Sequence, residues 1–232
     1  MSRFDMFRLK DLCIHGTSSC TLHFCIKWLG ISTSKVTLTL KSSGLTTVAK
    51  CLISCGANLD GPYGSPVDTL NAVFEEFPRH GLLITKKSRL YSSLAFPDRR
   101  APRYINGCLE IMVDCTALVL LDRLKGLETK MGRTNNSRWG SRVCDLDLLS
   151  FENSISPNED SFNRWYNMPL EKQIITKPDE LLLPHPRLQD RAFVLKPLMD
   201  FAEDWRHPVL NYSVKEMLDL LSIDDRNSVV PI

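Results

Sequence analysis

The chain has 232 residues, of which 43% are hydrophobic and 24% are charged, and its formal net charge is +2. These values are typical of a folded protein with one sizeable core, and they exclude a uniformly basic surface, so any anion site must be a local cluster. The eight cysteines are scattered through apolar runs, which argues against a disulfide framework and favours a reducing cytoplasm. No apolar stretch approaches the roughly 20 residues of a membrane span, so we expect no membrane segment.

Residues 1–48 mix Ser, Thr and Lys with isolated apolar residues and show no sustained hydrophobic period. We expect them to form a poorly ordered N-terminal extension to a single domain over residues 49–232. The extension holds five possible zinc ligands, Cys13, His15, Cys20, His23 and Cys25. Their spacing matches neither paired C-x2-C knuckles nor a C2H2 finger, so metal binding is the less favoured interpretation here.

The first strand and helix of the domain follow directly. Lys50 to Cys55 is an apolar run that predicts a buried strand, and it stops at a small turn, Gly56-Ala57-Asn58. Ser65 and Pro66 are typical of an N-cap and a first helical position. The helix that they begin has an apolar stripe, and Pro78 and Gly81 are expected to end it.

Two strands, a second helix and a further strand come next. The runs 82–91 and 104–113 predict strands, with a loop over 92–103 between them. Leucines at steps of four and three predict one buried helix face, which Gly132 should end. Alternation over 145–151 predicts the next strand.

The polar segment 153–180 is expected to be an enlarged surface loop, and short helices are expected around 191–199 and 214–221. The resulting order β, α, β, β, α, β is that of a split βαβ unit. The sequence therefore predicts an α+β fold, a ferredoxin-like antiparallel sheet with helices packed on it.

The sharpest local feature is Asp145-Leu146-Asp147, because the two-residue period of a strand sends both carboxylates to one face. Two carboxylates about 7 Å apart can share a pair of Mg²⁺ ions, with phosphate oxygens as further ligands. By itself the motif also fits an edge strand whose outer face is acidic.

Arginines precede the two aspartates. Arg133, Arg138 and Arg142 lie within ten residues around Trp139, and such guanidinium forks can hold polyphosphate and stabilise charge on a bridging oxygen. A solvated loop is the alternative. Further on, prolines on both sides fix the backbone at His185, which predicts either a structural histidine or one aimed at phosphate.

Taken together, these residues resemble the 6-hydroxymethyl-7,8-dihydropterin pyrophosphokinase family from about Ala49 to the end of the chain. The resemblance is carried by Gly56-Ala57-Asn58, Tyr91, Tyr104-Ile105-Asn106, Gly132-Arg133, Arg138-Trp139-Gly140-Ser141-Arg142, Asp145-Leu146-Asp147, Pro184-His185-Pro186-Arg187 and Arg191-Ala192-Phe193.

The resemblance implies a monomeric enzyme that transfers the β,γ-diphosphate of ATP to the hydroxymethyl group of 6-hydroxymethyl-7,8-dihydropterin, giving AMP, in folate biosynthesis. It implies two Mg²⁺ ions on Asp145 and Asp147, and no nucleic-acid partner. The other roles that it implies are catalysis by Arg133, Arg138, Trp139 and Arg142; ATP binding by Glu128, Arg133, His185 and Arg191; and pterin binding by Gly56, Ser93, Tyr104, Asn106 and Phe193.

Two departures from the family pattern keep a second interpretation open. Ala57 replaces the usual serine of the turn, and Ser93-Leu94 replaces the usual Thr-Pro, which makes that loop less rigid. A catalytically silent relative that binds or interacts is therefore the alternative. A polymerase-β-type nucleotidyltransferase is disfavoured because Gly56 and Asp145 are far apart in the sequence.

Overall fold

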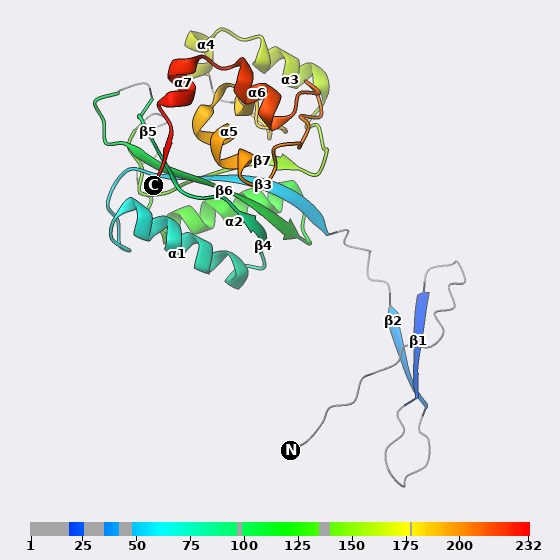
Figure 1. Cartoon of the computed structure of the whole chain (residues 1–232). Helices are drawn as coiled ribbons and strands as arrows, with labels where there is room; N and C mark the ends of the chain where they lie inside the picture. Colours follow the sequence, from blue (N-terminus) through cyan, green and yellow to red (C-terminus); the bar gives the residue numbers. More distant parts are fainter. Residues whose placement is uncertain (1–18, 26–34, 42–47, 97–98, 135–139, 177) are drawn as a thin grey trace. The chain divides into compact units, whose positions relative to one another are not determined.

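The computed structural model describes residues 19–25, 35–41, 48–96, 99–134, 140–176 and 178–232 (Figure 1). The chain divides into two compact units, residues 1–46 and 47–232. In the first unit, β1 (Ser19–Cys25) pairs antiparallel with β2 (Lys35–Lys41). Cys13 and His15 lie outside the described residues, and the predicted poor order of residues 1–48 stays a prediction. Among the described residues, no helix combines the length and the apolar character that crossing a membrane requires.

The second unit is built on an antiparallel sheet. Its central strands are β3 (Ala49–Ala57) and β6 (Tyr104–Val113). β7 (Asp145–Phe151) is the edge strand beside β3, and β4 (Leu83–Lys87) pairs with the other side of β6. The order β7-β3-β6-β4 places each βαβ crossover across one intervening strand. This arrangement is the split βαβ, ferredoxin-like topology, and it confirms the predicted α+β fold.

The first helix begins where the sequence predicts. α1 (Pro66–Arg79) has Ser65 as its N-cap, and the Ser65 side chain accepts from the Asp68 amide while Asp68 accepts from the Ser65 amide at 3.0 Å. This reciprocal capping box satisfies two backbone donors that the helix itself cannot pair. The helix ends at Arg79, between Pro78 and Gly81 as expected, and Gly81 takes a φ of +71°.

The second helix, α2 (Ala117–Lys130), buries the predicted leucine face completely. The chain turns after it at Gly132, whose φ of +97° is accessible to glycine at little cost, so the expected end is confirmed. A Cβ at Gly132 would also lie 2.6 Å from the Pro62 ring. This tight turn directs the chain into the arginine-bearing segment before β7.

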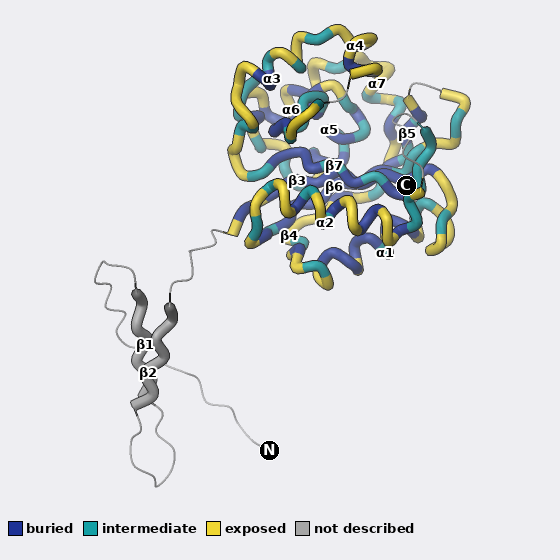
Figure 2. Tube along the Cα trace, turned by 180° about the vertical axis from the view of Figure 1, so that it is seen from behind, coloured by how far each residue is buried: buried dark blue, intermediate teal, exposed yellow. Residues whose placement is uncertain are grey.

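Two hydrophobic layers lie on opposite faces of the sheet. The strands between them are largely buried (Figure 2). One side of β3 contributes Cys51, Ile53 and Cys55 to the core under α1 and α2. Leu52 contributes from the other side to a core under α5 (Ala192–Met199) and α6 (Val214–Leu220). Successive side chains of β3 point to opposite faces, and both faces are covered, so the strand contributes to two cores.

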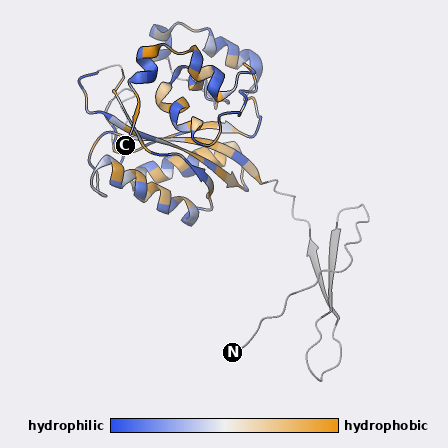
Figure 3. Ribbon diagram, in the orientation of Figure 1, coloured by the Kyte–Doolittle hydropathy of each residue, from blue (hydrophilic) through white to orange (hydrophobic). Residues whose placement is uncertain are grey.

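The segment expected to be a surface loop is more structured than the sequence suggests. It contains α3 (Glu159–Tyr166) and α4 (Leu170–Ile175), and Phe162 on α3 is fully buried against His207 at a ring-centroid distance of 5.1 Å. The ribbon of α3 is otherwise largely hydrophilic, which explains why its composition resembles that of a loop (Figure 3).

A single strand over 82–91 was the wrong expectation, because β4 ends at Lys87 and β5 (Tyr91–Ser93) begins after a break. Both strands pair with β6, at different parts of its length. The chain also ends with two elements that the sequence did not predict, α7 (Ile223–Asn227) and β8 (Val230–Pro231), and β8 pairs antiparallel with β5.

Candidate active site

The two aspartates lie at the start of β7, on one face of the strand. Asp145 and Asp147 are partly exposed, whereas Leu146 and Leu148 between and after them are 4% exposed and belong to the core. The alternation therefore anchors the strand through its leucines and presents both carboxylates on the opposite face, as predicted.

Arginines from three different parts of the chain converge on these carboxylates. Asp145 accepts from Arg133, at 2.9 Å, and from Arg142. Asp147 accepts from Arg191, at 3.0 Å. Two arginines precede the strand and the third forms the N-cap of α5, so the cluster depends on the tertiary fold and not on one local loop.

A buried glutamate lies beneath the cluster. Glu128, near the end of α2, accepts from the Leu146 amide at 2.8 Å and pairs with Arg133. Burial and the neighbouring Asp145 and Asp147 raise the pKa of Glu128 to about 7, although the Leu146 amide and Arg133 oppose the shift. Burial followed by the charge of Asp147 likewise raises the pKa of Asp145, against the two arginines.

His185 occupies a fixed position beside this cluster. Its amide donates to the Leu149 carbonyl at 2.8 Å, and its Nδ1 accepts from the Arg187 amide at 3.2 Å. Burial, and then the charges of Arg191 and Arg187, hold the pKa of His185 well below its ordinary value. The imidazole is therefore neutral at physiological pH, with Nδ1 as the acceptor.

The residues expected to bind a pterin form a separate, neutral group. Asn106 on β6 is 3% exposed and donates to the Ser93 hydroxyl at 2.9 Å. Gly56 faces Asn106 in the register of β3 and β6, and a Cβ at Gly56 would lie 3.5 Å from the Asn106 Oδ1 and 3.7 Å from the Tyr104 ring. The missing side chain at Gly56 leaves space beside a buried amide.

Tyr104 and Phe193 border this neutral group. The Tyr104 hydroxyl donates to the Gly140 carbonyl at 3.3 Å, and burial raises its pKa. Phe193 lies below the Arg191 guanidinium, with 5.5 Å from the guanidinium carbon to the ring centroid. Arg191 therefore touches both the acidic strand and the aromatic residue. A small hollow that is lined by Tyr104, Gly140, Ser141, Asn58, Ala95 and Phe96, among others, opens next to Tyr104.

The structure brings together every described residue of the predicted site, and Arg138 and Trp139 lie outside the described residues. Asn58 is a contributor that the sequence did not single out. Its side chain accepts from the Arg142 amide at 2.7 Å and donates to the Pro102 carbonyl at 3.0 Å, while its own amide donates to the Arg142 carbonyl. Asn58 therefore anchors both loops that flank the site; its place in the Gly56-Ala57-Asn58 turn was the available signal.

The paired carboxylates and arginines thus lie beside a group of uncharged side chains at one end of a split βαβ sheet, an arrangement suited to enzymes that transfer phosphate groups from a metal-bound nucleotide. This uncharged group, named the neutral slot from here on, consists of Gly56, Ser93, Tyr104, Asn106 and Phe193. The family model of 7,8-dihydro-6-hydroxymethylpterin-pyrophosphokinase (HPPK) matches residues 52–203. The chain belongs to this family.

Similar curated proteins agree with the family assignment. The 2-amino-4-hydroxy-6-hydroxymethyldihydropteridine pyrophosphokinase of Synechocystis sp. is 32% identical over 175 residues, which cover 75% of this chain and 77% of the relative. The protein of the same name from Pseudomonas aeruginosa is 33% identical over 161 residues, which cover 69% of this chain and 85% of the relative.

Solved structures support the fold. A crystal structure of Plasmodium falciparum HPPK-DHPS superposes with a TM-score of 0.54 at 15% identity, and the match covers 76% of this chain. It covers only 46% of the Plasmodium chain, so this chain spans less than half of that two-part protein. At this identity the likeness concerns the fold alone.

Proposed function

We propose that the chain is an HPPK enzyme that transfers the β,γ-diphosphate of ATP to the hydroxymethyl group of 6-hydroxymethyl-7,8-dihydropterin and releases AMP, as a step of folate synthesis. The observation that carries the proposal is the convergence of Arg133, Arg142 and Arg191 on the paired aspartates of β7. The family assignment and the names of the bacterial relatives supply the reaction class.

In the free chain the carboxylates and guanidinium groups balance one another. Within the described part of the chain, Asp145 pairs with Arg133 and Arg142, and Asp147 pairs with Arg191. An incoming polyphosphate offers the arginines new oxygen partners, with which they form short charge-assisted hydrogen bonds. Arg133 and Arg142 would then stabilise the charge that moves onto the bridging oxygen when the bond between the α-phosphate and the β-phosphorus breaks.

The aspartates fit a magnesium site. Among the described residues there is no cluster of three or more His, Cys, Asp or Glu side chains suited to a metal ion, so the further ligands of an ion at this pair would come from phosphate and water. Mg²⁺ is characteristically held by one or two carboxylates, with phosphate oxygens and water as its other ligands. Asp145 and Asp147 would hold two ions, whose bound charge neutralises the phosphates during transfer.

The neutral slot fits the second substrate. A pterin is flat and uncharged, and it needs aromatic walls and a few amide partners more than it needs charge. Asn106, Ser93 and the space above Gly56 offer these partners, with Tyr104 and Phe193 as walls. In this proposal the hydroxymethyl oxygen points toward β7 and attacks the β-phosphorus, and its proton leaves to solvent or base.

The proposal is tested by incubating the purified chain with ATP, Mg²⁺ and the dihydropterin, and by following nucleotide products with the pterin omitted as the control. AMP that appears only with the pterin supports the proposal. ADP as the product would indicate transfer of a single phosphoryl group, and no product from a folded chain would favour the silent relative. We also propose a cytoplasmic monomer; the unpaired cysteines Cys51, Cys55, Cys108, Cys115 and Cys144 support the compartment.

A further inference from the structure

The last residues of the chain lie against the strand that carries part of the neutral slot. β8 pairs antiparallel with β5, with Ser92 opposite Val230 and Tyr91 opposite Pro231. The Ile232 amide extends this pairing by donating to the Leu90 carbonyl at 3.0 Å. Residues 228–232, named the C-terminal segment from here on, lie outside the range 52–203 that the family model matches.

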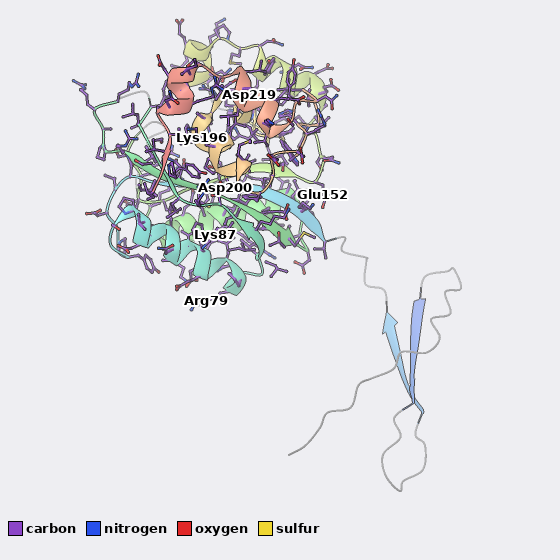
Figure 4. All side chains as sticks on the ribbon, in the orientation of Figure 1. Arg79, Lys87, Glu152, Lys196, Asp200 and Asp219 are labelled. Carbon is purple, nitrogen blue, oxygen red and sulfur yellow. The ribbon has the colours of Figure 1, made fainter. Side chains whose placement is uncertain are left out.

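Two cations fix the C-terminal segment to the rest of the domain. Lys196 on α5, labelled in Figure 4, is the first of them, and it donates to the Val229 carbonyl at 2.8 Å. Arg103 donates to the Ser228 carbonyl at 3.2 Å and, with the same guanidinium, to the Ser92 hydroxyl at 2.8 Å. Since Ser92 is in β5, Arg103 joins the loop before β6, the strand β5 and the C-terminal segment.

A small apolar cluster connects the segment to β5 and to Phe193. Val229 is 1% exposed and packs with Tyr91 of β5 and Ala192 of α5, and Phe193 lies against this cluster. Tyr91 is two residues before Ser93, and Phe193 is the expected aromatic wall. Val229 therefore occupies the junction between β5 and the N-terminal end of α5, the two elements that bring Ser93 and Phe193 to the slot.

β5 depends on this support for a physical reason. It is only three residues long, and it pairs with β6 on one side. The loop after β5 has Ser93-Leu94 in place of a proline that would restrict the backbone, so the chain must limit the freedom of this strand by contacts. β8 supplies the second partner strand, and Lys196 and Val229 hold β8.

We propose that the C-terminal segment, held by Lys196 and Val229, is a positioning element that sets β5 and Phe193 at the separation that the pterin needs. This inference rests on the proposed function. It assigns no chemical role to these residues, because none of them contacts Asp145, Asp147 or their arginines in the described contacts. Loss of the contacts that hold the C-terminal segment should weaken pterin binding and leave ATP binding and the transfer step largely unchanged.

The test compares Lys196→Met and Val229→Ala with Arg206→Met. Arg206 serves as the control, since it also donates to a backbone carbonyl, that of Asn211 at 2.8 Å, outside β5 and α5; its pair with the exposed Glu216 is lost as well. Lys196→Met and Val229→Ala should raise the KM for the dihydropterin about three- to tenfold, the range that losing one such contact produces, with kcat and the KM for ATP within about twofold. Lys196→Arg keeps the positive charge and a donor, so its KM for the dihydropterin should stay close to the wild-type value.

Two readouts separate this inference from the proposed function. Hydrogen exchange of the 90–94 peptide needs no substrate, and it should be faster in Lys196→Met and Val229→Ala than in wild type and Arg206→Met. Calorimetric pterin binding in the presence of a non-hydrolysable ATP analogue and Mg²⁺ gives the affinity without turnover. Unchanged exchange and unchanged pterin affinity in both variants would overturn the inference, as would an equal loss for both substrates. A wild-type chain that binds no pterin would instead overturn the proposed function.

Discussion

The charged half and the neutral half of the site are built in opposite ways. Asp145 and Asp147 are neighbours in one strand, partly exposed, and their arginine partners are long side chains that reach them from elsewhere. Asn106 and Ser93 are buried short side chains on two strands, and their positions depend on backbone pairing. A change in the charged half should therefore affect chemistry directly, whereas a change in the neutral half should affect the affinity for one substrate.

The largest effect is expected from Asp147→Asn. It removes one charge from the metal-binding pair at a partly exposed position, so turnover should fall about a thousandfold or more while the fold is kept. Steady-state AMP release and thermal unfolding check this. Asp219→Asn, which affects an exposed pair with Arg226, is the control and should turn over normally. Wild-type rates in Asp147→Asn would contradict the metal assignment.

Asn106→Ala tests the neutral half. The variant loses the buried amide that is expected to pair with the pterin, so the KM for the pterin should rise about 10- to 100-fold, with a much smaller change in the KM for ATP. Asn167→Ala removes an exposed amide at the end of α3 and serves as the control. If the variant lost kcat and kept its pterin KM, the division of the site into two halves would be wrong.

Gly56→Ala should have a smaller effect in the same direction. The added methyl group would be in ordinary contact with Asn106 and Tyr104, at 3.5 and 3.7 Å, so the chain should fold while the slot becomes narrower. We expect a pterin KM about two- to fivefold higher. Gly126→Ala on α2 is the matched control, because a Cβ there meets nothing within 4 Å. Equal KM values in the two variants would place the pterin away from Gly56.

Glu128 gives a test of the buried end of the charged half. Because its pKa is about 7 in the folded chain and ordinarily 4.5, the folded chain binds this proton more tightly, and stability falls as pH rises through that window. Glu128→Gln removes this dependence. The melting temperature of Glu128→Gln minus that of wild type should be about 2–4 °C more positive at pH 8 than at pH 5. A free-energy difference of ~1 kcal/mol produces a shift of this size in a chain of this length.

The control for that measurement is Glu159→Gln in the exposed first turn of α3, which makes the same carboxyl-to-amide change away from the cluster. The Arg133 guanidinium keeps Asp145 as a partner when Glu128 is replaced, so the comparison between pH values isolates the carboxyl proton. A larger gain at pH 5 than at pH 8 would mean that Glu128 is ionised in the folded chain throughout.

The sequence predicted those parts of the fold whose signals are local. The Ser65 cap, the leucine face of α2, the helix end at Gly132 and the alternation of β7 all depend on short stretches of chain, and all are confirmed. α3 was missed because its buried residues, Ser161 and Phe162, include only one apolar side chain, and the segment around them is polar. β8 was missed because a strand of two residues is too short to show a sequence pattern and is defined by its pairing with β5.

The site residues that the sequence could predict are likewise those with local signals. The aspartates and arginines could be identified from spacing and from the family resemblance, since charged side chains close together in sequence are a readable pattern. Two contacts could not be predicted from the sequence: the one by which Asn58 anchors Arg142, and the pairing of Arg191 with Asp147. Each joins residues more than 40 positions apart. Their roles follow from the strand order and from the turn before α5.

The most direct test of the central claim is to follow the β-phosphorus of ATP. With ATP labelled at the β-position, Mg²⁺ and 6-hydroxymethyl-7,8-dihydropterin, the account predicts that the label leaves the nucleotide, appears in a pterin diphosphate, and is absent from the AMP formed in equal amount. Label that stays in the nucleotide as ADP would contradict transfer of the diphosphate as a unit, and with it the proposed function.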